Sequence, residues 1–444
     1  MFSKRGDIVP GFEIFGKEEK EQVLEVLDSG VLFRYEFAAQ RKGVWKVAEF
    51  ERAFAAYTGA AHAQAVSSGT AALKVALAAL GVGAGDEVIT QGFTFVATWE
   101  AILDCGAVPV FTEVDLTLNM DPADLERKIT PKTRAILPVH MMGAPARIEA
   151  IKAIADRHGI PVLEDTAQAA GGRLHGRHLG TFGAIGTFSF DAVKTITTGE
   201  GGMCITGDES LWRRMSEYQD HGHDHQPNPG GRGGEGRPFI GFNYRMMEIQ
   251  GAIGLAQLTK LDRIVAAQQE NKRWFGEAVR VLPGVSFREI LDPAGDSATF
   301  LTFFLPDREQ CDRVSRVLRE QGAAAVRWSE NGWHYYPNWE HLLEGKTPCH
   351  GGWPFTAHGK RRVIYDRRHC PPRRRSSSGP SPTRCRSCSP RSRRPVSPRP
   401  CSRRPGPEPF PRAARFRGGP VHFASVATPT PVYTSKRTAL PRST

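Results

Sequence analysis

Short apolar segments alternate with helical patterns from about residue 45 to residue 206. Strands that alternate with helices form a mostly parallel sheet with helices on both of its faces. Because the ligands of such sheets bind at the carboxyl ends of the strands, we expect the functional residues to follow the strands. The predicted strands span residues 63–66, 87–90, 108–114, 135–139, 162–164, 186–189 and 203–206.

The 444 residues are enough for two or more domains. We assign residues 30–258 to a large sheet domain, and residues 1–29 together with 259–366 to a smaller α+β domain. Residues 367–444 contain 16 of the 32 prolines and have no apolar periodicity. Such a composition cannot bury a core, so we predict a disordered tail.

The same tail carries the positive charge of the chain. It holds 19 of the 59 Lys and Arg residues and a single acid, Glu408, which leaves 40 basic and 46 acidic residues elsewhere. We therefore expect no nucleic-acid binding by the body of the chain. The tail is either an arginine–serine segment that binds RNA or phosphate-rich partners, or the product of a shifted reading frame. We favour the frameshift, because the break falls inside a domain that lacks its closing elements.

The sequence also argues against membrane and metal functions. No apolar run reaches the roughly 18 residues that span a bilayer, and the chain does not start with a signal-peptide core. We predict a cytoplasmic protein that does not contact membranes. Cys385 and Cys388 lack a second pair, and His221, His223 and His225 alternate in a glycine-flanked loop. We therefore predict no metal site and place this loop near the substrate.

Lys194 lies between a short apolar strand and the glycine-rich turn 199–202, five residues after Ser189. Asp165 ends another apolar strand. A lysine whose pKa is lowered by burial or by nearby cations forms Schiff bases with carbonyls. Pyridoxal phosphate (PLP) requires such a lysine, an acidic partner for its ring nitrogen and donors for its phosphate. The residues therefore predict a PLP enzyme in which Lys194 is the nucleophile and then the general base.

The remaining cofactor contacts follow from the same strand ends. Asp165 would face the ring nitrogen, or else cap a helix. Gln168 would donate to the phenolic oxygen of the ring, or else be an exposed helix residue. Gly69 and Thr70 open a predicted helix after a strand, where backbone N–H groups bind anions, so we assign them to the phosphate together with Ser189.

Two aromatic residues, Phe93 and Phe95, come just after another predicted strand. We expect Phe95 to stack on the pyridine face of the cofactor. A plain core role for both rings is an open alternative.

At these residues the chain resembles the sugar aminotransferases of the DegT/DnrJ/StrS family. The resemblance covers residues 10–365 and is strongest in the segments 67–72, 164–168, 188–202 and 241–252. It implies a PLP fold-type-I aminotransferase, with a large, mostly parallel seven-stranded sheet domain and a smaller α+β domain. It also implies a homodimer with shared active sites, in which Asn243 reaches the cofactor phosphate of the partner subunit.

Within this family, residues 30–35, 45–47 and 220–223 are similar to transaminases that form 8-amino-3,8-dideoxy-manno-octulosonate. Those enzymes move an amino group from glutamate to the C8 aldehyde of an eight-carbon sugar acid. The similarity implies that Arg34, Tyr35 and His223 contact the substrate, with the arginine suited to its carboxylate.

Other functions remain open at this point. One is a 3-amino-5-hydroxybenzoate synthase, and another is a regulatory protein that binds PLP without turnover. Sugar 3-dehydratases of the family replace the lysine with histidine, so Lys194 argues against that activity.

Overall fold

The computed structural model describes residues 12–225, 231, 233, 236–323, 325–356, 365–366 and 422–427, all within one compact unit. Within the predicted tail, residues 367–444, the structure describes residues 422–427. Cys385 and Cys388 lie outside the described residues. Among the described helices, none is both long and apolar enough to cross a bilayer.

The large domain contains two sheets that adjoin. One has the strand order β1 (His62–Val66), β9 (Gly202–Thr206), β8 (Ile185–Ser189) and β5 (Leu163–Asp165). The other has the order β3 (Val108–Thr112), β2 (Glu87–Gln91) and β4 (Thr133–Leu137). Two parallel bridges, Ile136 to Val162 and Val139 to Asp165, connect the β4 and β5 edges. Only β9 runs antiparallel to its neighbours in these two sheets.

This arrangement confirms the mostly parallel α/β fold. The predicted strands all exist, with small shifts of their ends. The structure records them as a four-stranded and a three-stranded sheet, rather than as one continuous sheet of seven.

Helices cover both faces of these strands. On β2, Val88 packs in a core cluster with Leu77, whereas Ile89 packs in another cluster with Ile151. Successive strand residues point to opposite faces, so each face has its own core. The covering helices are α2 (Lys46–Thr58), α3 (Gly69–Ala79), α4 (Val96–Asp104), α5 (Pro122–Lys128), α6 (Ile148–His158) and α7 (Glu209–Tyr218).

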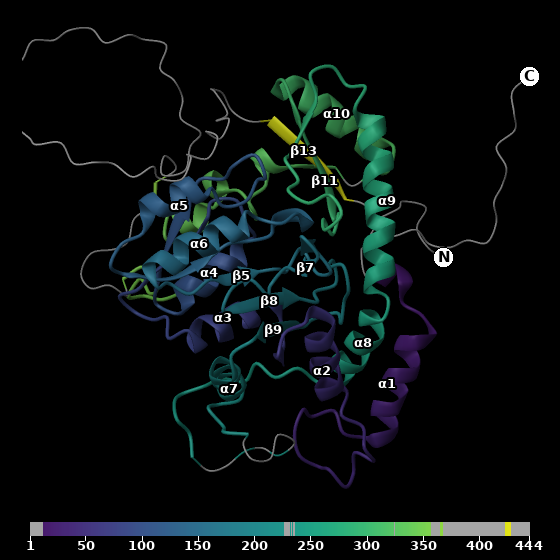
Figure 1. Cartoon of the computed structure of the whole chain (residues 1–444), viewed down its shortest axis with the longest axis vertical. Helices are drawn as coiled ribbons and strands as arrows, with labels where there is room; N and C mark the ends of the chain where they lie inside the picture. Colours follow the sequence, from purple (N-terminus) through teal and green to yellow (C-terminus); the bar gives the residue numbers. More distant parts are fainter. Residues whose placement is uncertain are drawn as a thin grey trace, which may run out of the picture. The chain divides into compact units, whose positions relative to one another are not determined.

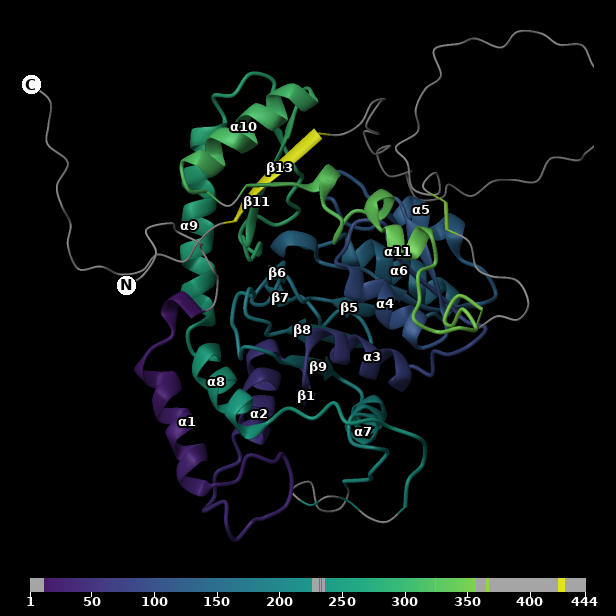
Figure 2. The ribbon, with the colours of Figure 1, turned by 180° about the vertical axis from the view of Figure 1, so that it is seen from behind.

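The smaller part of the molecule is built on two consecutive helices, α8 (Glu248–Leu258) and α9 (Leu261–Val279). Figures 1 and 2 show these helices running past α1 (Lys17–Ser29) toward a second sheet. A buried carboxylate fastens α1 to them, because Glu19 accepts hydrogen bonds from Lys260 and Gln257 at 2.7 Å each. The second sheet has the order β10 (Ser286–Phe287), β11 (Phe300–Leu305), β13 (His422–Ala427) and β12 (Ala325–Arg327), and α10 (Arg308–Glu320) precedes β12.

Strand β13 corrects one prediction, since its residues belong to the segment predicted to be a disordered tail. It pairs antiparallel with β11 over six residues and with β12 over three. The physical reason is local: His422-Phe-Ala-Ser-Val-Ala427 contains neither proline nor arginine, and its backbone N–H groups are free to join a ladder. Composition averaged over the whole tail hides this short segment.

The segment that follows the second sheet packs on β3 and α4. Residues beyond β12 return to the large domain, where Tyr336 and Trp339 pack with Trp99 of α4 and Phe111 of β3. The short helix α11 (Glu340–Leu343) belongs to this return segment, and a two-stranded hairpin, β6 (Arg173–Leu174) with β7 (Arg177–His178), precedes β8.

A half-buried acid beside β3 makes the stability of the fold depend on pH. Burial, together with the neighbouring Asp124 carboxylate, raises the pKa of Glu113 to about 7. A folded-state pKa above the unfolded one means that the deprotonated carboxylate costs stability above about pH 7, and that the cost vanishes below the unfolded pKa of about 4.5. We expect Glu113→Gln to raise the melting temperature at about pH 8 and to leave it unchanged at about pH 4. Thermal melts of this variant and of Glu126→Gln, an exposed control, test this; an equal rise at both pH values would contradict it.

Candidate active site

The N-terminus of α3 lies beside the end of β8. Ser68 caps the helix, its Oγ accepting from the Ala71 N–H at 3.0 Å. Gly69 lies directly against Ser189 at the end of β8, and a Cβ at position 69 would come within 2.6 Å of the serine Cβ. No side chain therefore separates the helix N-terminus from the Ser189 hydroxyl. Backbone N–H groups and one hydroxyl converge there, as anion binding requires, and Thr70 is exposed beside them.

A buried carboxylate stands at the end of β5. Asp165 accepts a hydrogen bond from the Thr98 hydroxyl at 2.9 Å and one from the Ala167 N–H at 3.1 Å. Burial raises the pKa of Asp165, while these two donors and the charge of Lys194 oppose the rise. The residues after Asp165 form turns rather than a helix, so the alternative role as a helix cap is wrong.

Gln168 lies in that turn and is half-buried. Its Oε1 accepts the Met142 N–H at 2.9 Å, and its backbone carbonyl accepts the Thr299 hydroxyl at 3.0 Å. Because the oxygen of the amide is engaged by the backbone, the NH2 group is the end that can donate to a ligand.

Lys194 follows β8 in a tight turn, where its N–H donates to the Asp191 carbonyl at 3.0 Å. Burial lowers the pKa of Lys194, and the carboxylates of Asp191 and Asp165 act in the opposite direction. A lysine with a lowered pKa has more of the neutral amine that attacks carbonyls. Its Nζ lies 5.9 Å from the centre of the Phe95 ring.

Phe95 faces the lysine from the start of α4, and it is 38% exposed, whereas Phe93 is buried. The plain core role therefore fits Phe93 alone. Phe95 stacks on Trp333 with the ring centres 6.0 Å apart and lies 5.2 Å from the ring of His334. Burial, together with the charge of Lys194, lowers the pKa of His334 to about 3.

Sequence reasoning missed Trp333 and His334. Backbone hydrogen bonds from Thr94 to His334 and from Val96 to Trp333 place them at the site, at 3.0 and 2.9 Å. The run of four aromatic residues at 333–336 was the available signal.

These groups match what PLP requires: donors for a phosphate, a carboxylate, an amide donor, an aromatic ring and a lysine with a lowered pKa. Residues 13–351 match the DegT/DnrJ/EryC1/StrS aminotransferase family. The chain belongs to this family. It is thus an aminotransferase of fold type I, from a family that depends on PLP, as predicted.

Known relatives of this aminotransferase act in sugar pathways. GDP-perosamine synthase of Caulobacter vibrioides is 45% identical over 230 residues, which cover 52% of this chain and 60% of that protein. The spore coat polysaccharide biosynthesis protein SpsC of Bacillus subtilis is 40% identical over 291 residues, which cover 64% of this chain and 72% of that protein.

Among solved structures, 3-amino-5-hydroxybenzoic acid synthase superposes with a TM-score of 0.65 at 32% identity, over 73% of this chain and 82% of the other. None of these three relatives is named as an octulosonate transaminase, so that finer assignment stays a prediction.

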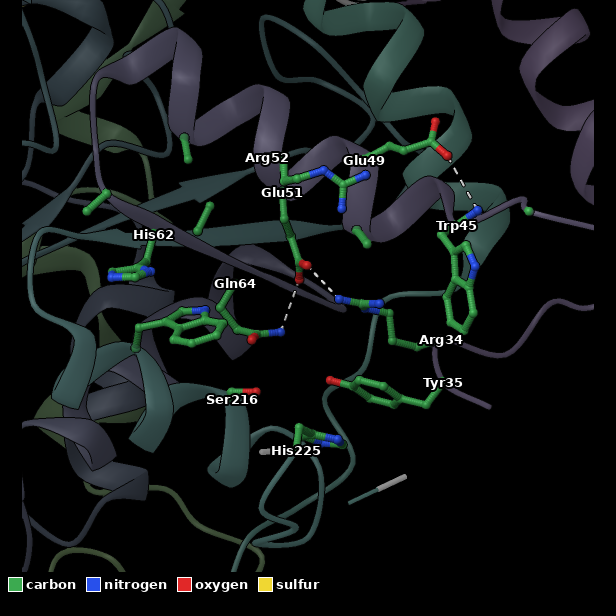
Figure 3. Close-up of a pocket in the computed structure, with 16 residues that line it drawn as sticks. Arg34, Tyr35, Trp45, Glu49, Glu51, Arg52, His62, Gln64, Ser216 and His225 are labelled. Carbon is green, nitrogen blue, oxygen red and sulfur yellow. Dashed lines mark hydrogen bonds and ion pairs between the residues drawn. The ribbon is translucent and has the colours of Figure 1, made fainter. Parts of the chain in front are cut away.

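Two of the predicted substrate residues line a cavity whose lining does not include Lys194. Arg34 and Tyr35 line a cavity of about 420 Å³ between α2, β1 and α7 (Figure 3). Arg34 donates to Glu51 at 2.5 Å, and Tyr35 stacks on His225 with the ring centres 4.1 Å apart. The cavity is lined by the first residues of β1, whereas the anion site follows its last residue.

His223 and Asn243 lie in the segments between α7 and α8. His223 is buried, and its ring is 2.6 Å from a guanidinium nitrogen of Arg237. Asn243 is exposed, and its Oδ1 accepts the Arg245 N–H at 3.3 Å. The carbonyl of the next residue, Tyr244, accepts the Ser67 N–H at 2.8 Å, so this segment runs beside the start of α3. No hydrogen bond, ion pair or ring contact within the described residues joins His223, Asn243, Arg34 or Tyr35 to Lys194.

Proposed function

We propose that this aminotransferase binds PLP at Lys194 and moves an amino group from glutamate or glutamine to a keto- or aldehyde-sugar. The observation that carries the proposal is the convergence of Lys194, Asp165 and the Gly69–Ser189 contact at the carboxyl ends of β1, β5 and β8. PLP, when bound, supplies an electron sink for the carbon that gains or loses the amino group.

In this proposal each residue of the site has its own role toward PLP. Asp165 holds a proton on the ring nitrogen by its negative charge. Gln168 donates to the ring oxygen, and Phe95 packs on the ring face. The N–H groups at Gly69 and Thr70, with the Ser189 hydroxyl, bind the phosphate. Lys194 moves the proton at the reacting carbon.

The finer substrate assignment is an eight-carbon sugar acid with an aldehyde at C8. It rests on the resemblance at residues 30–35, 45–47 and 220–223. In this assignment Arg34 binds the carboxylate, with Tyr35 and His223 beside it. Arg34 would then have to exchange part of its ion pair with Glu51 for the substrate, as an arginine with five N–H donors can.

A synthase of 3-amino-5-hydroxybenzoate is the second candidate, because the structural match to that enzyme is extensive. A single-turnover screen separates the two. The amino form of the cofactor is prepared on the enzyme with glutamate, and keto-sugars, the C8 aldehyde and an aminodeoxy cyclic ketone are added separately. Loss of the absorbance of the amino form with one sugar class identifies the acceptor. A visible band that neither glutamate nor glutamine bleaches would favour a binding protein without turnover.

Asn243 provides a test of the proposed homodimer with shared active sites. Asn243→Ala should weaken cofactor retention, because one hydrogen bond to a charged phosphate is lost. If the contact is made across the dimer, mixing Asn243→Ala with Lys194→Ala chains gives heterodimers with one intact site and one doubly altered site. At low PLP concentration, activity should recover to about a quarter of the wild-type sites, since half of the dimers are mixed. Heterodimers without any recovery would show that Asn243 acts within its own chain or not at all.

A further inference from the structure

Two fully buried polar side chains, His140 and Glu164, lie directly behind the proposed cofactor site. The His140 Nε2 is 2.9 Å from the Glu164 Oε2, and neither side chain has any exposed surface. Glu164 precedes Asp165 on β5, and successive strand residues point to opposite faces. The pair is therefore on the far face of the strand from the Asp165 carboxylate, where it cannot touch a ligand of that carboxylate.

The hydrogen bonds of His140 fix which nitrogen carries the proton. Its Nδ1 accepts the Ala146 N–H at 3.0 Å. In the neutral ring the other nitrogen then bears the hydrogen, so Nε2 donates to Glu164. The Glu164 carboxylate also accepts the N–H groups of Gly180 and Gly183, at 2.9 and 2.6 Å. Three donors converge on it, and this full satisfaction makes the pair rigid rather than adaptable.

The pair holds a loop whose backbone is strained. The His140 N–H donates to the Asp165 carbonyl at 3.0 Å, and the loop then turns through Met142, whose φ is +56°. A left-handed conformation is unfavourable for methionine and persists only where the surroundings enforce it. The strained residue is the one whose N–H donates to Gln168 Oε1. The left-handed turn at Met142 therefore directs the Met142 N–H at the amide oxygen of Gln168.

We propose that His140 and Glu164 are positioning residues that fix the loop 140–143, and through the Met142 N–H keep the Gln168 NH2 group directed at the cofactor ring. This inference rests on the proposed function, which assigns Gln168 to the ring oxygen. Loss of the pair frees the loop to relax at Met142, and the Gln168 amide then loses the contact that sets its orientation.

The test compares His140→Ala with Gln168→Ala in the enzyme reconstituted with PLP. Two quantities are measured: the dissociation constant of PLP, and the pH midpoint of the visible absorption band of the cofactor on Lys194. We expect Gln168→Ala to move the midpoint and to weaken PLP binding by about tenfold, the loss of one hydrogen bond to a buried group. His140→Ala should reproduce the midpoint shift, and the double variant should add little to either single one, because both act through one contact.

Two further variants distinguish a loss of positioning from a loss of folding. His140→Asn retains an acceptor for the Ala146 N–H and loses the donor to Glu164; it replaces His140→Ala if that chain does not fold. Thr187→Val is the matched control, since its buried hydroxyl donates to the Glu164 carbonyl at 3.1 Å and not to the loop. We expect this control to lower the melting temperature at most, with an unchanged midpoint.

The failures are distinguishable. If the wild-type chain forms no visible band with PLP, the proposed function falls. If Gln168→Ala shifts the midpoint and the His140 variants lower only the melting temperature, the positioning role is overturned while the proposed function stands. The positioning role is equally overturned if Gln168→Ala leaves both the midpoint and PLP binding unchanged.

Discussion

Lys194→Ala is expected to abolish turnover, with a fall in kcat on the order of 10⁵-fold or more, as for the removal of other catalytic nucleophiles. The chain loses both the group that bonds to the cofactor carbonyl and the base that moves the proton at the reacting carbon. The variant should also lack the visible absorption band of lysine-bound PLP. Absorption spectra with and without glutamate, together with steady-state rates, measure both effects.

The same substitution should not weaken the fold. The pKa of Lys194 is lowered by burial, so the folded chain binds this proton less tightly than the unfolded chain. Below the folded-state pKa the lysine is charged in both states, and the folded state bears the whole cost of the buried charge. Lys194→Ala removes that cost, and the melting temperature without cofactor should be unchanged or higher. Lys152→Ala is the control, because Lys152 is half-exposed and forms an ion pair with Asp156 within the helix α6. Normal turnover of Lys194→Ala would rule out the assigned role.

The groups that follow strands could be predicted from sequence because strand ends constrain their neighbours. Ser189 and Asp165 end apolar strands, Gly69 opens the helix after another strand, and parallel strands bring their carboxyl ends to one edge. Gln168 was predicted to follow Asp165 on a helix, whereas the segment is a turn, and its contact with the cofactor stays a prediction. Its orientation depends on Met142, which no periodicity in the sequence connects to it.

Other features depend on contacts between distant segments. Trp333 and His334 reach Phe95 by backbone pairing across more than 200 residues of sequence, and no local pattern contains that information. The ion pair of Arg34 with Glu51 could not be predicted from the sequence either, because it depends on how α2 packs on β1. Strand β13 shows the converse error, because composition averaged over a long segment concealed six residues able to join a ladder.

Asp165→Asn is expected to lower kcat by about 10³-fold, the scale of losing a preorganised charge at a reacting site. The carboxylate lies at the end of β5 and acts on Lys194 by its charge, and an amide cannot hold a proton on the ring nitrogen by charge. The amide remains able to accept from Thr98, so the fold should persist with little change in melting temperature. PLP affinity should fall as well, and fluorescence titration with PLP measures it apart from turnover.

Thr98→Val should lower the rate less than Asp165→Asn does. The Thr98 hydroxyl donates to Asp165 at 2.9 Å and lowers the pKa of the carboxyl against the effect of burial. Without this donor the pKa of Asp165 rises further, so the carboxyl stays protonated to a higher pH. We therefore expect the acid limb of the pH–rate profile to move to higher pH, with a loss of about tenfold at most near the optimum. A profile that does not move, or an Asp165→Asn variant that keeps its activity within tenfold of wild type, would show that Asp165 does not act on the cofactor through its charge.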